Sequence, residues 1–472
     1  MSGVSAGSLL GRMIREEYRL HSELFGDRFA AFPLLVAALS GAGFWLLTLT
    51  DVGVGAVAAG LHGLVFFFGL QVGSIGLVGR DALRDVLGDV TLLVFSARTL
   101  PVTWRRLLAV FLLKDLIYYS VLFLGPLAAG YAVFAVTAGV PVGDVGLLYL
   151  TTAATFAYGA GASLTAAGVA TRSRIARLGL LAGVVAVTTA TVAGRVDPVA
   201  LSPLAFYESP SLATAAAGFG PVVVLSVLGP LTFRPADGGA ARSSPDRYSR
   251  VRTLLSDDTG VATRSTLEVA RSSGSVWKVL FSMGVLFGVT ALLVREVGRA
   301  TALDPSPGIA FGTLLGLGAF TTYSWVTQFD DRREYLRYPL SMDAVFAGKR
   351  RAFLVLSVPA GYAYLALSLL WIPLSEVAIG AVVFPLVAVY VFGVTAYVTG
   401  LAPNELLFDT PLFAAFGAAL ALVSLPLVVA ALTHTEAPTA STRTALAVAV
   451  LGAIVGVVLA RRAGPRWAAK GR

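Results

Sequence analysis

The chain of 472 residues contains no cysteine, three histidines and four lysines, and only 13% of its residues are charged. Without cysteine it has no disulfide, thiolate nucleophile, iron–sulfur cluster or cysteine-ligated zinc. His21, His62 and His434 lie in three distant segments, so we expect no metal site, and we interpret His62 as a packed helix-end side chain, with a functional role as the alternative. The P-loop pattern Gly-x-x-x-x-Gly-Lys-Ser/Thr fails at every lysine, so we expect neither ATP hydrolysis by that route nor a cofactor in this chain.

The low charge accompanies a hydrophobic content of 56% and a mean hydropathy of +0.79. Soluble domains carry about 25% charged residues, so this composition is typical of a membrane protein. Apolar runs of about 20 residues favour membrane-spanning helices over the strands of about ten alternating residues found in outer-membrane barrels. The 50 glycines suit close helix contacts in lipid. We therefore predict an all-α fold, a polytopic membrane helical bundle.

Windows of about 19 residues predict about twelve transmembrane helices. They lie near 32–50, 54–79, 107–137, 145–170, 178–194, 214–233, 277–295, 306–328, 351–373, 377–400, 411–433 and 444–461. If the N-terminus is cytoplasmic, 31 of the 36 lysines and arginines fall on the cytoplasmic side. We therefore expect a multi-pass protein of the cytoplasmic (plasma) membrane with both termini in the cytoplasm. The same asymmetry accounts for the net charge of +9, so no nucleic-acid partner is expected.

The segment before the first predicted span has the pattern of an amphipathic helix. Its apolar positions are Leu10, Ile14, Tyr18 and Phe25, and its polar positions are Arg12, Arg15, Glu16, Arg19 and Glu23. Apolar residues at helical spacing opposite arginines are typical of a helix that lies in the headgroup layer. We predict such an interfacial helix in contact with membrane lipid, with an ordinary solvated helix as the alternative.

Residues 234–262 are rich in proline, glycine, serine and charge, which predicts a flexible cytoplasmic linker. The linker divides the chain into a first six-span half, residues 1–233 with the interfacial helix, and a second six-span half, residues 263–472. An even number of spans in each half gives both halves the same orientation. We therefore predict two parallel six-helix repeats.

A short motif after the second span of each half supports the repeat. "RTLPVTWRRLLAVFLL" begins at Arg98 and "LRYPLSMDAVFAGKRR" begins at Leu336. The matched positions are Pro101 with Pro339 and Thr103 with Ser341. Proline suits a turn or the first turn of a helix, and a Thr or Ser hydroxyl can cap the helix that follows. The motif predicts a cytoplasmic corner that leads into the third span.

This corner, together with the interfacial helix, resembles the permeases of type-2 ATP-binding-cassette exporters. The second copy is closer to the family pattern, because Glu334 supplies its acidic residue while Ser96 stands at the matching place in the first. The resemblance implies a permease subunit that exports an unidentified substrate, driven by a separate cytoplasmic ATPase, in two copies, that docks on the corners and interfacial helices. The implied docking residues are Arg98, Pro101, Thr103, Trp104, Arg105, Arg106, Glu334, Arg337, Tyr338, Pro339, Ser341 and Asp343, with Arg12, Arg15 and Arg19 on the interfacial helix. It also implies a partly helical external segment between the fifth and sixth spans, which residues 195–211 fit.

A secondary carrier with two parallel repeats is the first alternative. Such carriers keep ionisable residues at membrane depth, and here only Lys114 and Asp115 lie inside a predicted span. They lie near its cytoplasmic start, where we interpret them as an interfacial pair, with a transport relay as the alternative. Glu376, at an outer span end, is expected to be solvated.

An intramembrane, Mg²⁺-dependent prenyl or lipid transferase is the second alternative. Asp81, Asp85 and Asp89 recur every four residues and so share one helical face, where three carboxylates would hold Mg²⁺ and a diphosphate. The second half has no such spacing, and neighbouring arginines allow simple helix ion pairs. We therefore favour a charged interfacial helix and predict no metal site.

Overall fold

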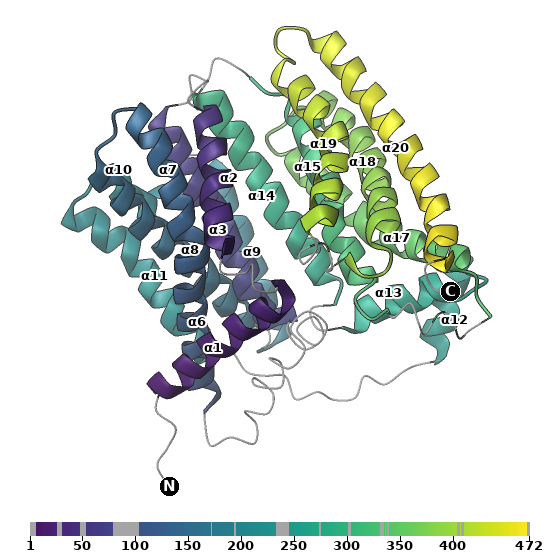
Figure 1. The fold of residues 1–472 in the computed structure, drawn as a ribbon, viewed down its shortest axis with the longest axis horizontal. Coiled ribbons are helices and arrows are strands. Elements are labelled where there is room, and N and C mark those ends of the chain that lie inside the picture. Colours follow the sequence, from purple (N-terminus) through teal and green to yellow (C-terminus); the bar gives the residue numbers. More distant parts are fainter. Residues whose placement is uncertain are drawn as a thin grey trace. The chain divides into compact units, whose positions relative to one another are not determined.

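The computed structural model describes residues 6–25, 31–47, 53–78, 103–170, 172–192, 195–232, 245–272, 275–300, 304–330, 335, 337, 339–403, 406 and 410–469. The regular secondary structure of these residues is all helical (Figure 1). The chain forms two compact units, Met1–Asp237 and Gly238–Arg472. The division lies inside the segment predicted as a linker.

The first unit begins with α1. Its later helices occur in the same order along the chain as the six predicted spans. The helices of the unit are α1 (Ala6–Phe25), α2 (Phe32–Leu47), α3 (Val54–Val78), α6 (Trp104–Tyr119), the π-helical η2 (Ser120–Leu124), α7 (Gly125–Thr137), α8 (Val142–Ala170), α9 (Arg174–Val192), the 3₁₀ turn η3 (Val199–Leu201), α10 (Pro203–Glu208) and α11 (Leu212–Thr232). α6, η2 and α7 run on without a break. Pro126 lies in the first turn of α7, where its missing N–H interrupts the regular hydrogen-bond ladder.

Within the first unit, α8 packs most extensively on α3 and next on α11, while α2 packs on α7. Small residues allow these close contacts, because a Cβ on Gly69 of α3 would overlap the carbonyl oxygen of Phe156 on α8. α10 packs on α8 and α11, so the expected partly helical segment between the fifth and sixth spans is present. α1 lies across the end of the unit at which α6 begins (Figure 1).

The second unit starts with two short helices and continues with six long ones. They are α12 (Pro245–Leu254), α13 (Val261–Arg271), α14 (Trp277–Ala300), α15 (Pro307–Val326), α17 (Met342–Ser368), α18 (Leu374–Thr399), α19 (Thr410–Leu432) and α20 (Pro438–Ala469). The sequence predicts a flexible linker through residue 262, whereas α12 and the start of α13 are helical. The shorter segment between α19 and α20 forms turns.

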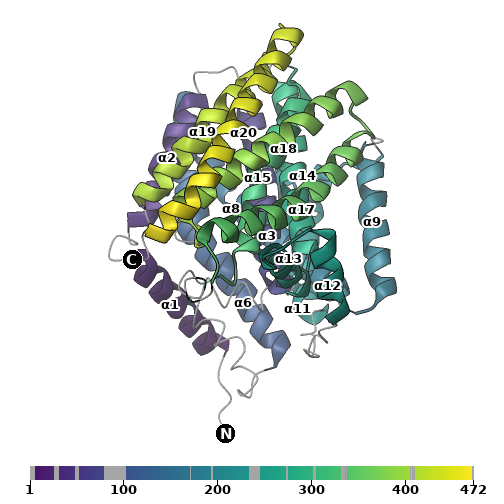
Figure 2. The ribbon, with the colours of Figure 1, turned by 90° about the vertical axis from the view of Figure 1, so that its right-hand side faces the viewer.

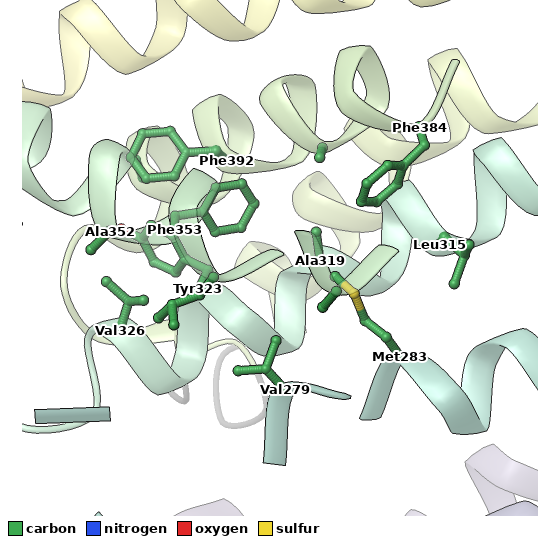
Figure 3. Close-up of a cluster of buried hydrophobic side chains, with 14 of the residues drawn as sticks. Val279, Met283, Leu315, Ala319, Tyr323, Val326, Ala352, Phe353, Phe384 and Phe392 are labelled. Atoms are coloured by element: carbon green, nitrogen blue, oxygen red, sulfur yellow. The ribbon is translucent and has the colours of Figure 1, made fainter. Parts of the chain in front are cut away.

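Within the second unit, α18 packs most extensively on α15 and next on α20, which Figure 2 shows running beside α18 and α19. The core is aromatic where α15, α17 and α18 meet: the Phe392 ring centroid lies 5.4 Å from that of Tyr323 and 5.2 Å from that of Phe353 (Figure 3). The Tyr323 hydroxyl donates to the Gly400 carbonyl at 2.5 Å. This core lies directly beside the polar cluster described below, because Val326 belongs to both.

Nine stretches in the described part of the chain are long and apolar enough to cross a membrane. They are α3, the α6–α7 segment, α11, α14, α15, α17, α18, α19 and α20. This content identifies a multi-pass membrane protein. The other three predicted spans coincide with the helices α2, α8 and α9, which are not among these nine stretches. The count of twelve spans therefore stays a prediction.

Candidate functional site

A buried lysine joins α13 to α17 in the second unit. The Lys349 side chain is fully buried, and its Nζ lies 2.5 Å from Asp330 Oδ2. The same ammonium donates to Ser265 Oγ on α13 at 2.7 Å and to the Val326 carbonyl at the end of α15 at 2.9 Å. A buried charge is tolerated only when it is paired and hydrogen-bonded. Lys349 therefore holds α13, α15 and α17 together at one point.

Tyr335 closes this cluster from the segment before α17. Its hydroxyl donates to Asp330 Oδ1 at 2.7 Å, and its ring centroid lies 6.0 Å from both Lys349 Nζ and the Arg264 guanidinium carbon. Burial first, and then the charge of Asp330, raise the pKa of Tyr335, so it remains a phenol donor. Arg264 is itself paired with Glu268 at 2.7 Å on the exposed side of α13. Tyr335 thereby satisfies the second oxygen of the carboxylate that neutralises Lys349.

Asp257 organises the start of α13. Its Oδ2 accepts from the backbone N–H of Thr263 at 2.7 Å and from the Thr263 hydroxyl at 2.9 Å, while its Oδ1 accepts from Gly260 N and the Thr259 hydroxyl. Burial opposes ionisation, but the four hydrogen bonds outweigh it and lower the pKa of Asp257 below its ordinary value. Gly260 has φ +76°, a conformation that favours glycine. The entry into α13 is therefore fixed by one carboxylate.

A second buried lysine joins α6 to α1 in the first unit. Lys114 Nζ of α6 lies 2.7 Å from Glu17 Oε2 of α1 and 2.7 Å from Asp115 Oδ1. An apolar contact surrounds this bridge, formed by Leu9, Met13, Leu107 and Val110. The predicted Lys114–Asp115 pair exists, and Glu17 completes it. α1 is thus tied to α6 by charge as well as by packing.

The predicted amphipathic pattern of α1 is correct, but its buried face is displaced from the predicted one. The exposed arginines are Arg12, Arg15 and Arg19, and Arg19 Nε lies 2.8 Å from Glu16 Oε2. The most buried positions are Leu9, Met13 and Glu17. Of the predicted apolar face, Leu10 and Ile14 are half-buried and Tyr18 is 46% exposed, because α6 covers only the neighbouring face of the helix. α1 therefore has three faces, one toward α6, one apolar and one charged.

The predicted docking residues divide into those that the structure describes and those outside it. Arg98, Pro101, Glu334 and Tyr338 lie outside the described residues, as do Asp81, Asp85 and Asp89. Arg105, Arg106, Arg337, Pro339 and Asp343 are exposed, and Trp104 is the first residue of α6. The described docking residues that carry a charge therefore present it to the surface.

The two predicted helix caps behave differently. Ser341 is the N-cap of α17, and its side chain accepts from Ala344 N at 3.2 Å, as predicted. Thr103 occupies the same position before α6 with the same extended backbone, yet its hydroxyl makes no capping hydrogen bond. The backbone conformation of these two cap residues is thus shared, while only Ser341 makes the capping hydrogen bond.

Glu376 contradicts the expectation that it is solvated. Its Oε2 accepts from Ser306 Oγ at 2.5 Å and from Gly308 N at 3.0 Å, at the start of α15. Its Oε1 lies 3.3 Å from His434 Nε2, and the Glu376 side chain is only 15% exposed. His62 is packed, as predicted, with its ring between the Ala58 carbonyl and the Thr151 hydroxyl, but it lies inside α3 rather than at a helix end. Glu376 was misjudged because sequence position gives no information about which helix start lies opposite.

Sequence reasoning also missed that lysine is used here as a buried residue. Lys114, Lys278 and Lys349 are each 3% exposed or less, although lysine rarely buries fully unless paired. Lys278 donates to Ser272 Oγ at 2.7 Å and lies 4.4 Å from the Trp325 ring centroid. The available signal was the scarcity of lysine, because arginine supplies nearly all of the positive charge.

In the described part of the chain, no group of three His, Asp or Glu side chains is arranged to hold a metal ion. No protein-family model matches this chain. Neither a curated protein nor a solved structure matches it.

Proposed function

We propose that the chain is the membrane-spanning permease subunit of an ATP-binding-cassette exporter and is driven by a separate cytoplasmic ATPase. In this proposal, twelve spans form two parallel six-helix repeats in the cytoplasmic membrane, with both termini in the cytoplasm. Two ATPase copies dock on the corners before α6 and α17 and on the interfacial helices α1 and α13.

One observation carries the proposal: each unit builds the same corner from different residues. In each, an amphipathic helix precedes the first long helix and packs on the start of the helix that follows the Pro-x-Thr/Ser motif. In each, a lysine of that later helix is buried against the amphipathic helix. The packing order supports the repeat as well, because α8 with α3 and α11 corresponds to α18 with α15 and α20.

In this proposal, the buried lysines transmit movement from the docked ATPase to the long helices. A force applied to α13 passes to α17 through Ser265 and Lys349, and to the end of α15 through Val326 and Asp330. Breaking such a buried bridge costs several kcal/mol, about 3–5, so these helices move as one body. ATP-driven closure of the ATPase pair would then bias an equilibrium between two packings of the long helices.

Mild-detergent co-purification of the full chain tests the proposal, followed by reconstitution with the ATPase that it retains. Reversing Arg105 and Arg106 to Glu should weaken ATPase association by about tenfold, more strongly at low salt. Asp343→Arg should act more weakly, by about threefold or less, because it reverses one charge rather than two. Arg195→Glu, an exposed reversal outside the corners, is the control.

Three results would contradict the proposal. The first is wild-type ATPase binding and stimulated hydrolysis in the correctly inserted double reversal. The second is ion-coupled flux from the purified chain alone, which would establish the secondary carrier. The third is Mg²⁺-dependent transfer of a prenyl group that is lost in Asp85→Asn, which would establish the transferase.

A further inference from the structure

α12 is the described helix of the predicted linker, and the proposed function gives it no role. Its exposed residues Arg247, Arg250 and Leu254 follow helical spacing and so lie on one face. Leu254 is 81% exposed, among the most exposed large apolar side chains of the second unit. An exposed leucine that shares a helix face with two arginines is typical of a helix that meets a membrane surface.

The other side of α12 is fastened to the loop that precedes α13. Arg252 Nε donates to the Asp257 carbonyl at 3.0 Å, and its Nη2 donates to the Asp258 carbonyl at 2.9 Å. The Tyr248 hydroxyl lies against Gly260, where a Cβ would collide with it. Since Arg252 and Tyr248 point toward the loop, the orientation of the face with Leu254 is set by the fold.

Arg351 places this face at the level of the lipid headgroups. Its Nη1 donates to the carbonyl of Ser256, two residues after Leu254, at 2.8 Å. After Arg351 the chain has 24 uncharged residues before Glu376, so Arg351 marks the point at which α17 leaves the polar layer. Ser256 lies at that depth, and Leu254 lies close to it.

We propose that α12 is a surface helix that binds anionic phospholipid in the leaflet beside α13. Leu254 enters the boundary between headgroups and acyl chains, and Arg247 and Arg250 bind lipid phosphates. An arginine near an anionic surface is attracted to it, and an arginine stem also covers apolar surface. The third face, with Ser249 and Thr253, is polar and faces water. This inference is independent of any ATPase.

Single cysteines test the proposal cleanly, because the chain has no cysteine of its own. A nitroxide on Leu254→Cys is compared with one on Ser249→Cys, in the full chain reconstituted in phosphatidylcholine nanodiscs with or without phosphatidylglycerol. The measurement is collision with a water-soluble nickel chelate and with oxygen. Both sites are exposed, so neither label disturbs packing; matching melting temperatures serve as the check.

With phosphatidylglycerol, we expect the label at 254 to be protected from nickel at least about threefold relative to the label at 249. Removing the anionic lipid, or adding Arg247→Gln and Arg250→Gln, should abolish most of that difference. Equal exposure of the two labels in anionic nanodiscs would overturn the proposal. Protection that is unchanged without anionic lipid, or that arises only when an ATPase is added, would overturn it as well.

Discussion

The two units each bury a lysine between an amphipathic helix and a long helix, but they neutralise it differently. Lys114 has two carboxylates, Glu17 from α1 and Asp115 from its own helix. Within the part of the chain that the structure describes, Lys349 has one, Asp330, and completes its hydrogen bonds with a hydroxyl and a carbonyl. The first corner is thus a charged bridge between two helices, while the second joins three elements through neutral oxygens. The two buried lysines are therefore neutralised by quite different charge arrangements.

The largest expected difference comes from removing one carboxylate from each corner. Asp330→Asn removes the carboxylate that pairs with Lys349 and should lower the free energy of unfolding by about 3–5 kcal/mol. Glu17→Gln leaves Lys114 paired with Asp115 and should cost about 1 kcal/mol. Unfolding by sodium dodecyl sulfate in mixed micelles measures both, with the exposed Asp258→Asn as the control.

Adding Lys349→Met to Asp330→Asn should restore most of the loss, because the uncompensated charge is removed. If Asp330→Asn unfolds at the wild-type detergent fraction, Asp330 is not the group that neutralises Lys349.

Substitution of glycine by alanine compares a helix position in close contact with a neighbouring helix in the second unit with an open helix position in the first unit. A Cβ on Gly393 of α18 would overlap the carbonyl oxygen of Gly456 on α20, whereas a Cβ on Gly183 of α9 meets nothing within 4 Å. Gly393→Ala should therefore lower stability by about 1–3 kcal/mol through overpacking. Gly183→Ala should be neutral or slightly stabilising. Equal effects in the same micelle assay would show that α18 and α20 do not touch at Gly393.

Acid sensitivity separates the start of α13 from the rest of its unit. The folded-state pKa of Asp257 is below its ordinary value of 3.8, so the stability it contributes is present above about pH 4 and is lost as pH falls through the folded pKa. Asp257→Ala should cost about 1 kcal/mol at neutral pH and remove this part of the acid dependence. Hydrogen exchange of α13 amides from pH 6 to pH 3 measures the effect, with exposed Asp246→Ala as the control. A parallel acid profile in wild type and Asp257→Ala would refute it.

The smallest expected difference lies in the two helix caps. Ser341→Ala removes the hydrogen bond to Ala344 N and should cost about 1 kcal/mol. Thr103→Ala removes a hydroxyl that makes no capping bond and should cost only a few tenths, about 0.3 kcal/mol. Helix-end amide exchange in α17 and α6 resolves the two. Equal losses would indicate that the caps are equivalent in solution.

Several features of the fold were predictable because they depend on local sequence. The long apolar runs predicted the positions of the long helices, and proline followed by Ser341 predicted the start of α17. The ion pair of Lys114 with the adjacent Asp115 was also predicted. In each case the deciding interaction lies within a few residues of the chain, so the sequence carries the information directly.

The predictions that were wrong concern features that depend on contacts between distant segments of the chain. The buried face of α1 was misplaced because two neighbouring sets of apolar residues, Leu9 with Met13 and Leu10 with Ile14, follow the same helical spacing. Only the contact with α6 determines that Leu9 and Met13 are the buried set. Likewise, the composition of residues 245–254 is that of a linker, and their helix is held by the carbonyls of Asp257 and Asp258. Neither the helical spacing nor the composition of a segment indicates which distant residues it will contact.

The sequence by itself determined that this protein is helical, that it is apolar enough for a membrane, and that it lacks the cysteine on which thiol chemistry depends. The tertiary structure alone decided which charges are buried: Lys349 with Asp330, and Glu376 with Ser306 and Gly308. The physical reason is that hydrophobicity is a property of each residue, whereas the neutralisation of a buried charge depends on atoms brought together from distant parts of the chain.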